Sequence, residues 1–177
     1  MIIGNFFKQI KPEYKKHKFT GLCFDSLKCK KGFIFFAIKG TVIDGKKFIT
    51  QAIQKGARTI ISSQEFEGFK ENILYIKSSN VRKSLSRTTY SIYQNKPKNI
   101  IAVTGTNGKS SITDFYFQIL KLNKIKVASI GTLGIKKGNY VRSVSNTTID
   151  PIKLSKVLNQ LKKKKLIMLY WKHLVMG

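Results

Sequence analysis

A glycine-rich segment leaves few folds open to this chain: Gly105-Thr106-Asn107-Gly108-Lys109-Ser110-Ser111. Before it stands the apolar run Ile100 to Thr104, which is typical of a buried strand. After it, Lys109 to Leu122 is predicted to be a helix, with an apolar side formed by Ile112, Phe115, Phe117, Ile119 and Leu120. Strand, glycine loop and helix in this order are typical of a loop that binds the phosphates of a nucleoside triphosphate.

Each residue type in the loop suits phosphate chemistry. Glycines let backbone N–H groups turn inward around phosphate oxygens, and the helix N-terminus adds partial positive charge. We predict that Gly105 to Ser111 bind ATP, that Lys109 acts catalytically on the β- and γ-phosphates, and that the Ser110 hydroxyl is a ligand of Mg²⁺. Val103 stands where the strict motif has its first glycine, so the loop is a variant. The alternative is a glycine-rich turn with a solvated lysine.

The rest of the chain alternates between strand and helix patterns, which predicts a parallel α/β architecture with right-handed crossovers. Further strands are predicted at Phe33–Ile38, Thr59–Ile61, Ile73–Ile76 and Lys126–Ile130. Further helices are predicted at Lys46–Lys55, from the cap Asn80 to about Asn95, and from the cap Asp150 through Pro151 to about Lys163.

A polar break, Lys96-Pro97-Lys98-Asn99, predicts a domain boundary. We expect a first domain at 1–96, a second at 97–165 and a separate tail at 166–177. About a hundred residues precede the phosphate loop, whereas a small P-loop kinase opens with its loop near the N-terminus. The first domain should therefore have a task of its own.

The chain of 177 residues has 34 Lys and Arg against 8 Asp and Glu, a formal net charge of +26. Such a charge is compatible with a basic nucleic-acid-binding protein, and that alternative stays open. The positive residues, however, run through the whole chain, and most are Lys beside many Ile, Asn, Phe and Tyr, the residues of A/T-rich codons. We therefore expect no specific nucleic-acid partner.

Few residues suit a metal or disulfide framework. His17, His173, Cys23 and Cys29 lie far apart or lack partners, which argues against a zinc site of four Cys or His ligands. Two cysteines make no disulfide scaffold, as expected in a reducing compartment. Because no stretch of about 18 apolar residues occurs and the N-terminus does not suit a signal peptide, we expect a soluble cytoplasmic protein without membrane association.

Several segments together resemble the Mur ligase family, and most closely its MurE type. The resemblance runs from about residue 20 to 163 and is carried by Phe24-Asp25-Ser26, Lys31 to Gly40, Asp44 to Ala57, Val103 to Ser110, Ile130 to Gly134, Asn146-Thr147-Thr148 and Asp150-Pro151. It implies a small N-terminal α/β substrate domain followed by the truncated start of a parallel-sheet P-loop ATPase domain.

The resemblance also implies the substrate contacts. Ser26 and the loop Thr41-Val42-Ile43 match the uridine-diphosphate contacts of the first domain, and Asn146, Thr147 and Thr148 match the polar triplet that holds the muramoyl-peptide end. The sequence departs from the family pattern at Leu27, where Arg usually follows Asp-Ser, and at Ile149, where Pro often follows Thr-Thr.

By the same resemblance, the family reaction is an ATP-dependent, Mg²⁺-assisted formation of a carbon–nitrogen bond. The partners are UDP-N-acetylmuramoyl-L-alanyl-D-glutamate, activated as an acyl phosphate, and an amino acid that is either diaminopimelate or lysine. The alternative is a nucleotide-binding module without ligase activity. Because the family's enzymes are much longer, we expect this chain to be inactive alone, with unpaired strand edges and exposed apolar faces in its second half.

The tail from Leu166 to Gly177 does not resemble the family as written. Plausible codons for this segment, taken from the last base of each preceding codon, yield the family's E-A-S-S-H-G motif. We therefore expect a frame-shifted tail, with the slip in an adenine run that encodes Lys162 to Lys165. The coding DNA tests this, because a single-base change in that run must restore a long family-like frame.

Overall fold

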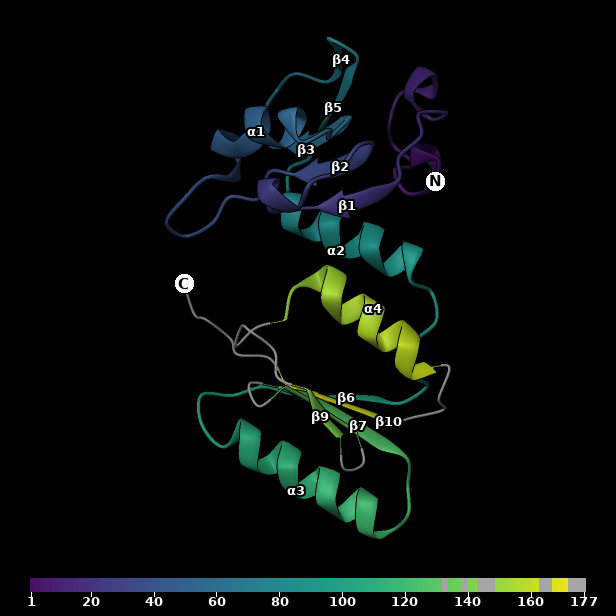
Figure 1. Cartoon of the computed structure of the whole chain (residues 1–177), viewed down its shortest axis with the longest axis vertical. Coiled ribbons are helices and arrows are strands. Elements are labelled where there is room, and N and C mark those ends of the chain that lie inside the picture. The colour runs from purple at the N-terminus through teal and green to yellow at the C-terminus, as the bar shows by residue number, and fades with distance from the viewer. Residues whose placement is uncertain (132–133, 138–139, 143–148, 163–166, 172–177) are drawn as a thin grey trace. The chain divides into compact units, whose positions relative to one another are not determined.

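The structure, a computed structural model, describes every residue except 132–133, 138–139, 143–148, 163–166 and 172–177 (Figure 1). The chain divides after Ile92 into two compact units. Each contains a sheet with helices on its faces, so the α/β class expected from the sequence is confirmed.

The sheet of the first unit has the strand order β1-β2-β3-β5-β4. Its strands are β1 (Gly21–Cys23), β2 (Phe33–Phe36), β3 (Thr59–Ser62), β4 (Gly68–Lys70) and β5 (Ile73–Lys77). Four of them run parallel, and β4 is antiparallel to β5. The strands β2, β3 and β5 confirm the sequence prediction, whereas the short strands β1 and β4 were not predicted.

Helices cover this sheet on both faces, which is why its central strands are apolar throughout. Phe35 of β2 and Ile60 of β3 pack with Ala52 of α1 (Ile49–Gln54) in one buried cluster. Ile34 and Phe36 point to the opposite face, because side chains alternate along a strand. Helix α2 (Val81–Ile92) contacts β2, and Figure 1 shows α1 and α2 on opposite sides of the sheet.

Capping residues mark where the helices and 3-10 turns of the first unit begin. The Asn80 carboxamide oxygen accepts a hydrogen bond of 2.8 Å from the backbone N–H of Lys83, which confirms the predicted cap of α2. The helix predicted at Lys46–Lys55 is shorter, because a 3-10 turn at Gly45–Phe48 precedes α1. Asp44 caps this turn, since its carboxylate accepts a hydrogen bond of 2.9 Å from the Lys46 N–H. Further 3-10 turns are found at Ile3–Asn5, Pro12–Tyr14 and Ser26–Lys28.

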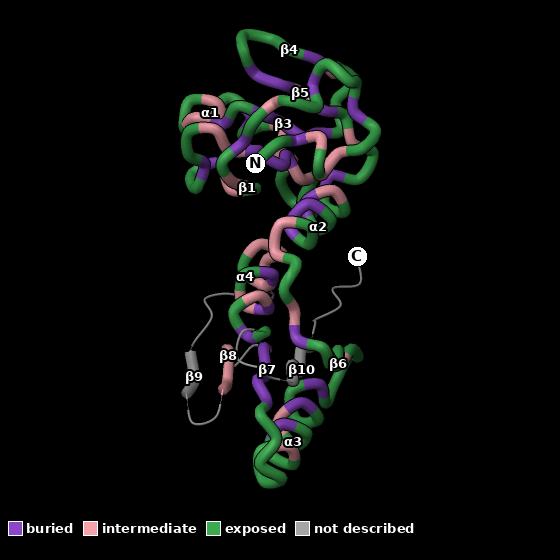
Figure 2. The backbone as a smooth tube through the Cα atoms, turned by 90° about the vertical axis from the view of Figure 1, so that its right-hand side faces the viewer, coloured by how far each residue is buried: buried purple, intermediate pink, exposed green. Residues whose placement is uncertain are grey.

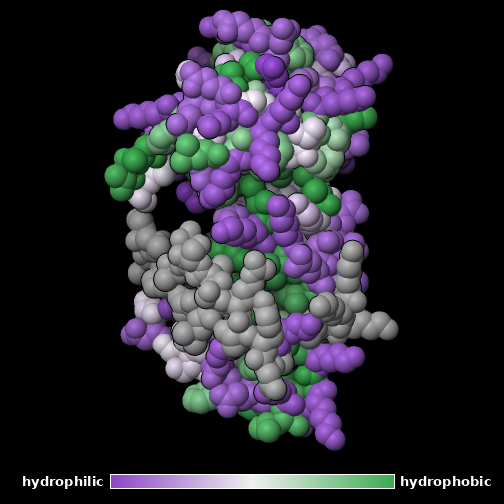
Figure 3. All heavy atoms as spheres, in the orientation of Figure 1, coloured by the Kyte–Doolittle hydropathy of each residue, from purple (hydrophilic) through white to green (hydrophobic). Residues whose placement is uncertain are grey.

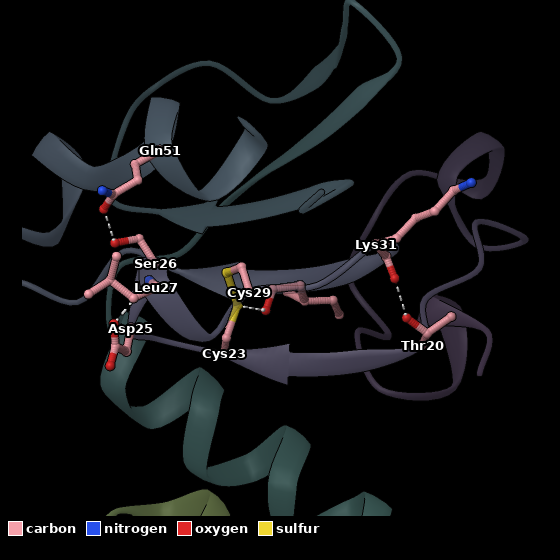
Figure 4. The surroundings of a disulfide bond; sticks show 9 residues. Thr20, Cys23, Asp25, Ser26, Leu27, Cys29, Lys31 and Gln51 are labelled. Carbon is pink, nitrogen blue, oxygen red and sulfur yellow. Dashed lines mark hydrogen bonds between the residues drawn. A yellow bond between two sulfur atoms is a disulfide. The ribbon is translucent and has the colours of Figure 1, made fainter. Parts of the chain in front are cut away.

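The expectation for the cysteines needs correction. Cys23, at the end of β1, and Cys29, just after the Ser26–Lys28 turn, form a disulfide with their Cα atoms 5.6 Å apart (Figure 4). The turn between them brings the two side chains back together, and a spacing of six residues in sequence does not reveal such a turn. Both cysteines are buried in the core beside Phe35.

In its described part, the second unit forms a sheet of order β6-β10-β7-β8-β9. The strands are β6 (Ile100–Val103), β7 (Val127–Gly131), β8 (Gly134–Lys137), β9 (Tyr140–Arg142) and β10 (Ile167–Trp171). Strand β10 runs parallel to both β6 and β7, so part of the predicted separate tail lies at the centre of the sheet. Strands β8 and β9 add an antiparallel extension that was not predicted.

Two helices cover the faces of this sheet, α3 (Lys109–Leu122) and α4 (Pro151–Lys162), and both confirm the prediction. Phe117 of α3 packs on Val127, while Leu158 and Leu161 of α4 pack with Ala128 and Ile130 on the other face. Because side chains alternate in direction along β7, one face of this strand packs on α3 and the other on α4.

The predicted apolar side of α3 is only partly correct. Phe117 is buried, but Ile112, Phe115 and Ile119 are exposed, and so are Tyr116 and Leu122. Figure 2 shows much of α3 in the colour of exposed residues. Figure 3 shows hydrophobic side chains over α3, while hydrophilic ones cover much of the visible face of the first unit. The exposed apolar surface expected in the second half is therefore confirmed.

Among the described residues, no helix is both long enough and apolar enough to cross a bilayer.

Candidate functional site

The loop between β6 and α3 has the backbone that the glycines predict. Gly105 has φ of +145° and Gly108 has φ of +74°, conformations that an L side chain rarely adopts. Gly108 is also the N-cap of α3 and brings no side chain to the helix end. The first N–H groups of a helix have no acceptor within it, so this end of α3 can receive an anion.

The space in front of the helix end is open. A Cβ atom placed on Gly108 would meet no heavy atom within 4 Å, and one on Gly105 would meet only the Asn107 carbonyl oxygen at 3.8 Å. Loop residues 104–108 are exposed to solvent. The approach to these backbone N–H groups is therefore open to solvent.

Lys109 supplies positive charge inside this loop. Its ammonium group donates hydrogen bonds to the carbonyl oxygens of Gly105 at 2.5 Å and Thr106 at 2.7 Å, and the residue is buried. A buried ammonium needs acceptors, and the loop backbone provides them. Phosphate oxygens bound in the loop would offer stronger, charged acceptors to the same group.

Ser110 and Ser111, in the first turn of α3, are exposed. The Ser110 hydroxyl is thus accessible as an oxygen ligand for Mg²⁺. Asp114, one turn further along, instead pairs with the Lys136 ammonium at 2.6 Å and accepts from Gln118, and the hydrogen bond from Lys136 lowers the pKa of its carboxyl. The described residues contain no cluster of three His, Cys, Asp or Glu.

In the first unit, Ser26 lies in the short turn after β1 (Figure 4). It is buried, and its hydroxyl donates to the Gln51 carboxamide oxygen of α1 at 2.5 Å. The preceding Asp25 accepts from the Leu27 N–H at 3.1 Å and pairs with Lys28 at 2.9 Å, which lowers the pKa of its carboxyl. The turn is therefore built to hold Ser26 in one place.

The loop Thr41-Val42-Ile43 follows β2, the strand next to β1, and is exposed. The Gly40 N–H donates to the Ile43 carbonyl oxygen at 3.0 Å, which closes the loop into a turn. Since parallel strands share one carboxyl edge, this loop and the Ser26 turn follow the same edge of the sheet, where open α/β sheets bind ligands.

Asn146, Thr147 and Thr148, the third predicted set, lie outside the described residues. Sequence reasoning missed Gln51, which holds the Ser26 hydroxyl from a separate helix. Its contact depends on the tertiary fold, so no local signal in the sequence identifies it. Asp25 and Asp44, which cap the turns beside the two loops, did carry a signal: each is an Asp just before a turn.

Two family models match adjoining parts of the chain. Residues 18–102 match the profile described as "Mur ligase family, catalytic domain", and residues 103–169 match the "Mur ligase middle domain". The chain belongs to the Mur ligase family. The second match covers the phosphate loop and extends four residues into the segment that the sequence alone did not assign to the family.

Two curated relatives are both named UDP-N-acetylmuramoyl-L-alanyl-D-glutamate–2,6-diaminopimelate ligase. The protein of Rickettsia prowazekii is 38% identical over 152 residues, which is 84% of this chain and 31% of the relative. That of Clostridioides difficile is 39% identical over 140 residues, 78% of this chain and 28% of the relative. The chain thus spans about a third of the length of these Mur ligases.

Solved structures agree at the level of the fold. A structure of a UDP-N-acetylmuramoyl-L-alanyl-D-glutamate–2,6-diaminopimelate ligase superposes with a TM-score of 0.78 and 25% identity, covering 97% of this chain and 36% of that one. A Thermotoga maritima MurF ligase in complex with ADP superposes with a TM-score of 0.54 at 21% identity, over 84% of this chain and 31% of that one.

Proposed function

We propose that this chain carries the uridine-nucleotide-binding and ATP-binding parts of a MurE-type ligase. In the proposed reaction, an amino acid is joined to UDP-N-acetylmuramoyl-L-alanyl-D-glutamate in peptidoglycan precursor synthesis. The observation that carries the proposal is the phosphate loop at Gly105–Ser111, which follows a separate α/β unit in a chain that resembles such ligases along most of its length.

In the second unit, the N-terminus of α3 and Lys109 would hold the phosphates of ATP, and Ser110 would hold Mg²⁺. Bound ATP would supply the phosphoryl group that activates the substrate carboxylate as an acyl phosphate. Lys109 would leave its loop carbonyl acceptors and stabilise the charge that develops on the transferred group. Residues Gly105 to Ser111 would therefore position the phosphates and neutralise their charge, without forming a covalent bond themselves.

In the first unit, the Ser26 turn and the Thr41–Ile43 loop would hold the uridine diphosphate, largely through backbone groups. Asn146, Thr147 and Thr148 would hold the muramoyl-peptide end. We assign the first domain to 1–96 and the second to 97–171, because β10 of the segment expected to be a separate tail pairs with β6 and β7. We assign the action of both domains to the cytoplasm, where ATP and the nucleotide substrate are found.

The names of the relatives favour diaminopimelate over lysine as the amino acid. Because the chain spans about a third of those relatives, we expect the 177-residue chain alone to bind nucleotides without completing the ligation.

Isothermal titration of the chain with ATP·Mg²⁺ and with UDP-N-acetylmuramoyl-dipeptide tests this proposal. We expect both to bind, each with one site. A phosphate-release assay with diaminopimelate or lysine should show no turnover by this chain. Binding of ATP alone would favour a simple nucleotide-binding module. Submicromolar, steeply salt-dependent affinity for RNA or DNA, with neither nucleotide bound, would favour a nucleic-acid-binding protein instead.

A further inference from the structure

The disulfide between Cys23 and Cys29 encloses the turn that holds Ser26 (Figure 4). These are the two cysteines of the whole chain. One ends β1 and the other follows the 3-10 turn, so the bond fixes both ends of the segment 24–28. A disulfide in a protein of a reducing compartment is usually transient, and either catalytic or redox-sensing.

The surroundings of the pair suit both oxidation states. The Cys23 sulfur lies 3.5 Å from the Ile34 carbonyl oxygen, an acceptor that a free thiol would donate to. Cys23 and Cys29 also pack among apolar side chains such as Phe35, where thiols are as easily accommodated as a disulfide. Reduction therefore need not disrupt the core.

Apart from the disulfide, the enclosed turn is held by local hydrogen bonds, from the Leu27 N–H to the Asp25 carboxylate and from the Lys28 N–H to the Asp25 carbonyl oxygen. Leu27 is 69% exposed, and the Asp25–Lys28 ion pair lies at the surface, where such pairs contribute little. The hydrogen bond from Ser26 to Gln51 links the turn to α1, and the turn also packs against this helix. Opening of this surface turn would also expose the buried sulfurs to a reductant.

We propose that Cys23 and Cys29 form a reversible redox pair that sets how firmly the Ser26 turn is ordered. This inference rests on the proposed function for its consequence: the oxidised chain binds the uridine nucleotide more tightly than the reduced one. A dithiol reductant is the co-reactant. Its two thiols become a disulfide, two electrons and two protons pass to the protein, the Sγ–Sγ bond breaks, and two thiols form.

The test uses the full chain equilibrated with oxidised and reduced dithiothreitol at fixed pH. Alkylation of free thiols with N-ethylmaleimide and intact-mass measurement report the redox state. Hydrogen exchange of the peptide spanning 24–28 reports the order of the turn, with the α3 peptide as internal control. Titration with UDP reports affinity. We expect faster exchange at 24–28 alone on reduction, and UDP affinity about tenfold weaker, the effect of re-ordering roughly one residue on binding.

The variant C23A/C29A is the matched control, since it should exchange at 24–28 like the reduced chain and bind UDP equally with and without reductant. If it fails to fold, the comparison of the two wild-type states still decides the matter. Two free thiols under every buffer ratio would overturn the proposal, as would equal exchange at 24–28 in both states. Absence of UDP binding in both states would instead contradict the proposed uridine site. Hydrogen exchange at 24–28 would then be the measurement that tests the redox pair.

Discussion

Lys109 places a positive charge inside the glycine loop that the sequence predicts. Its ammonium lies within the glycine loop and donates hydrogen bonds to the carbonyl oxygens of Gly105 and Thr106. Gly105 and Gly108 supply the positive-φ backbone that this turn requires.

Replacing this lysine should remove nucleotide binding selectively. For Lys109→Ala we expect ATP·Mg²⁺ affinity to fall by roughly 10- to 100-fold, because hydrogen bonds to a charged group are lost. Isothermal titration measures the change, and Lys126→Ala, at an exposed position in the same unit, should bind like wild type. Equal affinity of the two variants would contradict a phosphate-binding role.

His17 predicts a pH dependence in the first unit. Burial lowers the pKa of its imidazole below the ordinary value of about 6.5, and its Nε2 atom has no hydrogen-bond partner within the described residues. The unfolded chain therefore binds a proton more readily than the folded one. The stability that His17 contributes is complete above pH 6.5 and is lost as the pH falls from there through its folded pKa.

Urea denaturation at pH 7.5 and 5.5, monitored by hydrogen exchange of β2 and β3, measures this effect. Wild type should lose stability at the lower pH, and His17→Gln should lose less. Identical losses in the two proteins would mean that His17 does not titrate on unfolding.

At the scale of elements, helix caps are the clearest local determinants. Asn80 caps α2 in the first unit, and Asp150 caps α4 in the second by accepting from the Lys153 N–H at 2.8 Å. Both caps precede helices whose apolar faces pack on a sheet, so local signal and tertiary packing agree at these two positions.

Removing each cap should destabilise one unit and leave the other unchanged. Asn80→Ala is expected to cost the first unit about 1 kcal/mol, and Asp150→Ala to cost the second unit about the same. Hydrogen exchange under increasing urea, followed separately in β3 and β7, distinguishes the units. A parallel shift in both strands for either variant would show that the chain unfolds as one cooperative body.

At the scale of the whole molecule, the second unit exposes an apolar side of α3. Ile112, Phe115, Ile119 and Leu122 recur at helical spacing and are all exposed, and β6 beside this helix carries the exposed Ile100 and Ile101. An apolar stripe next to a strand with neighbours on one side is an aggregation hazard.

We therefore expect the chain to self-associate through its second unit. The double variant F115K/I119K should remain monomeric at concentrations where wild type forms larger species, as measured by size-exclusion chromatography with light scattering. Q54K/Q64K adds the same two charges at exposed positions of the first unit and should still associate. Wild-type protein that stays monomeric at all concentrations would contradict this prediction.

Much of this protein could be predicted because its signals are local. The glycine loop, the capped starts of α2 and α4 and the all-apolar strands β2 and β3 depend on residues a few positions apart. The short edge strands β1, β4 and β9 could not be predicted, since three residues carry no periodic pattern and pair only because a neighbour is present.

Short-range signals in the sequence specify the α/β class, the order of the principal elements and the glycine loop between β6 and α3, because turn chemistry and apolar runs act over short range. Tertiary structure decided the contacts between distant residues: the Cys23–Cys29 bond around the Ser26 turn, the hold of Gln51 on Ser26, and the place of β10 between β6 and β7. These contacts form when folding closes long loops and aligns strands, so their energies depend on neighbours that no short window of sequence contains.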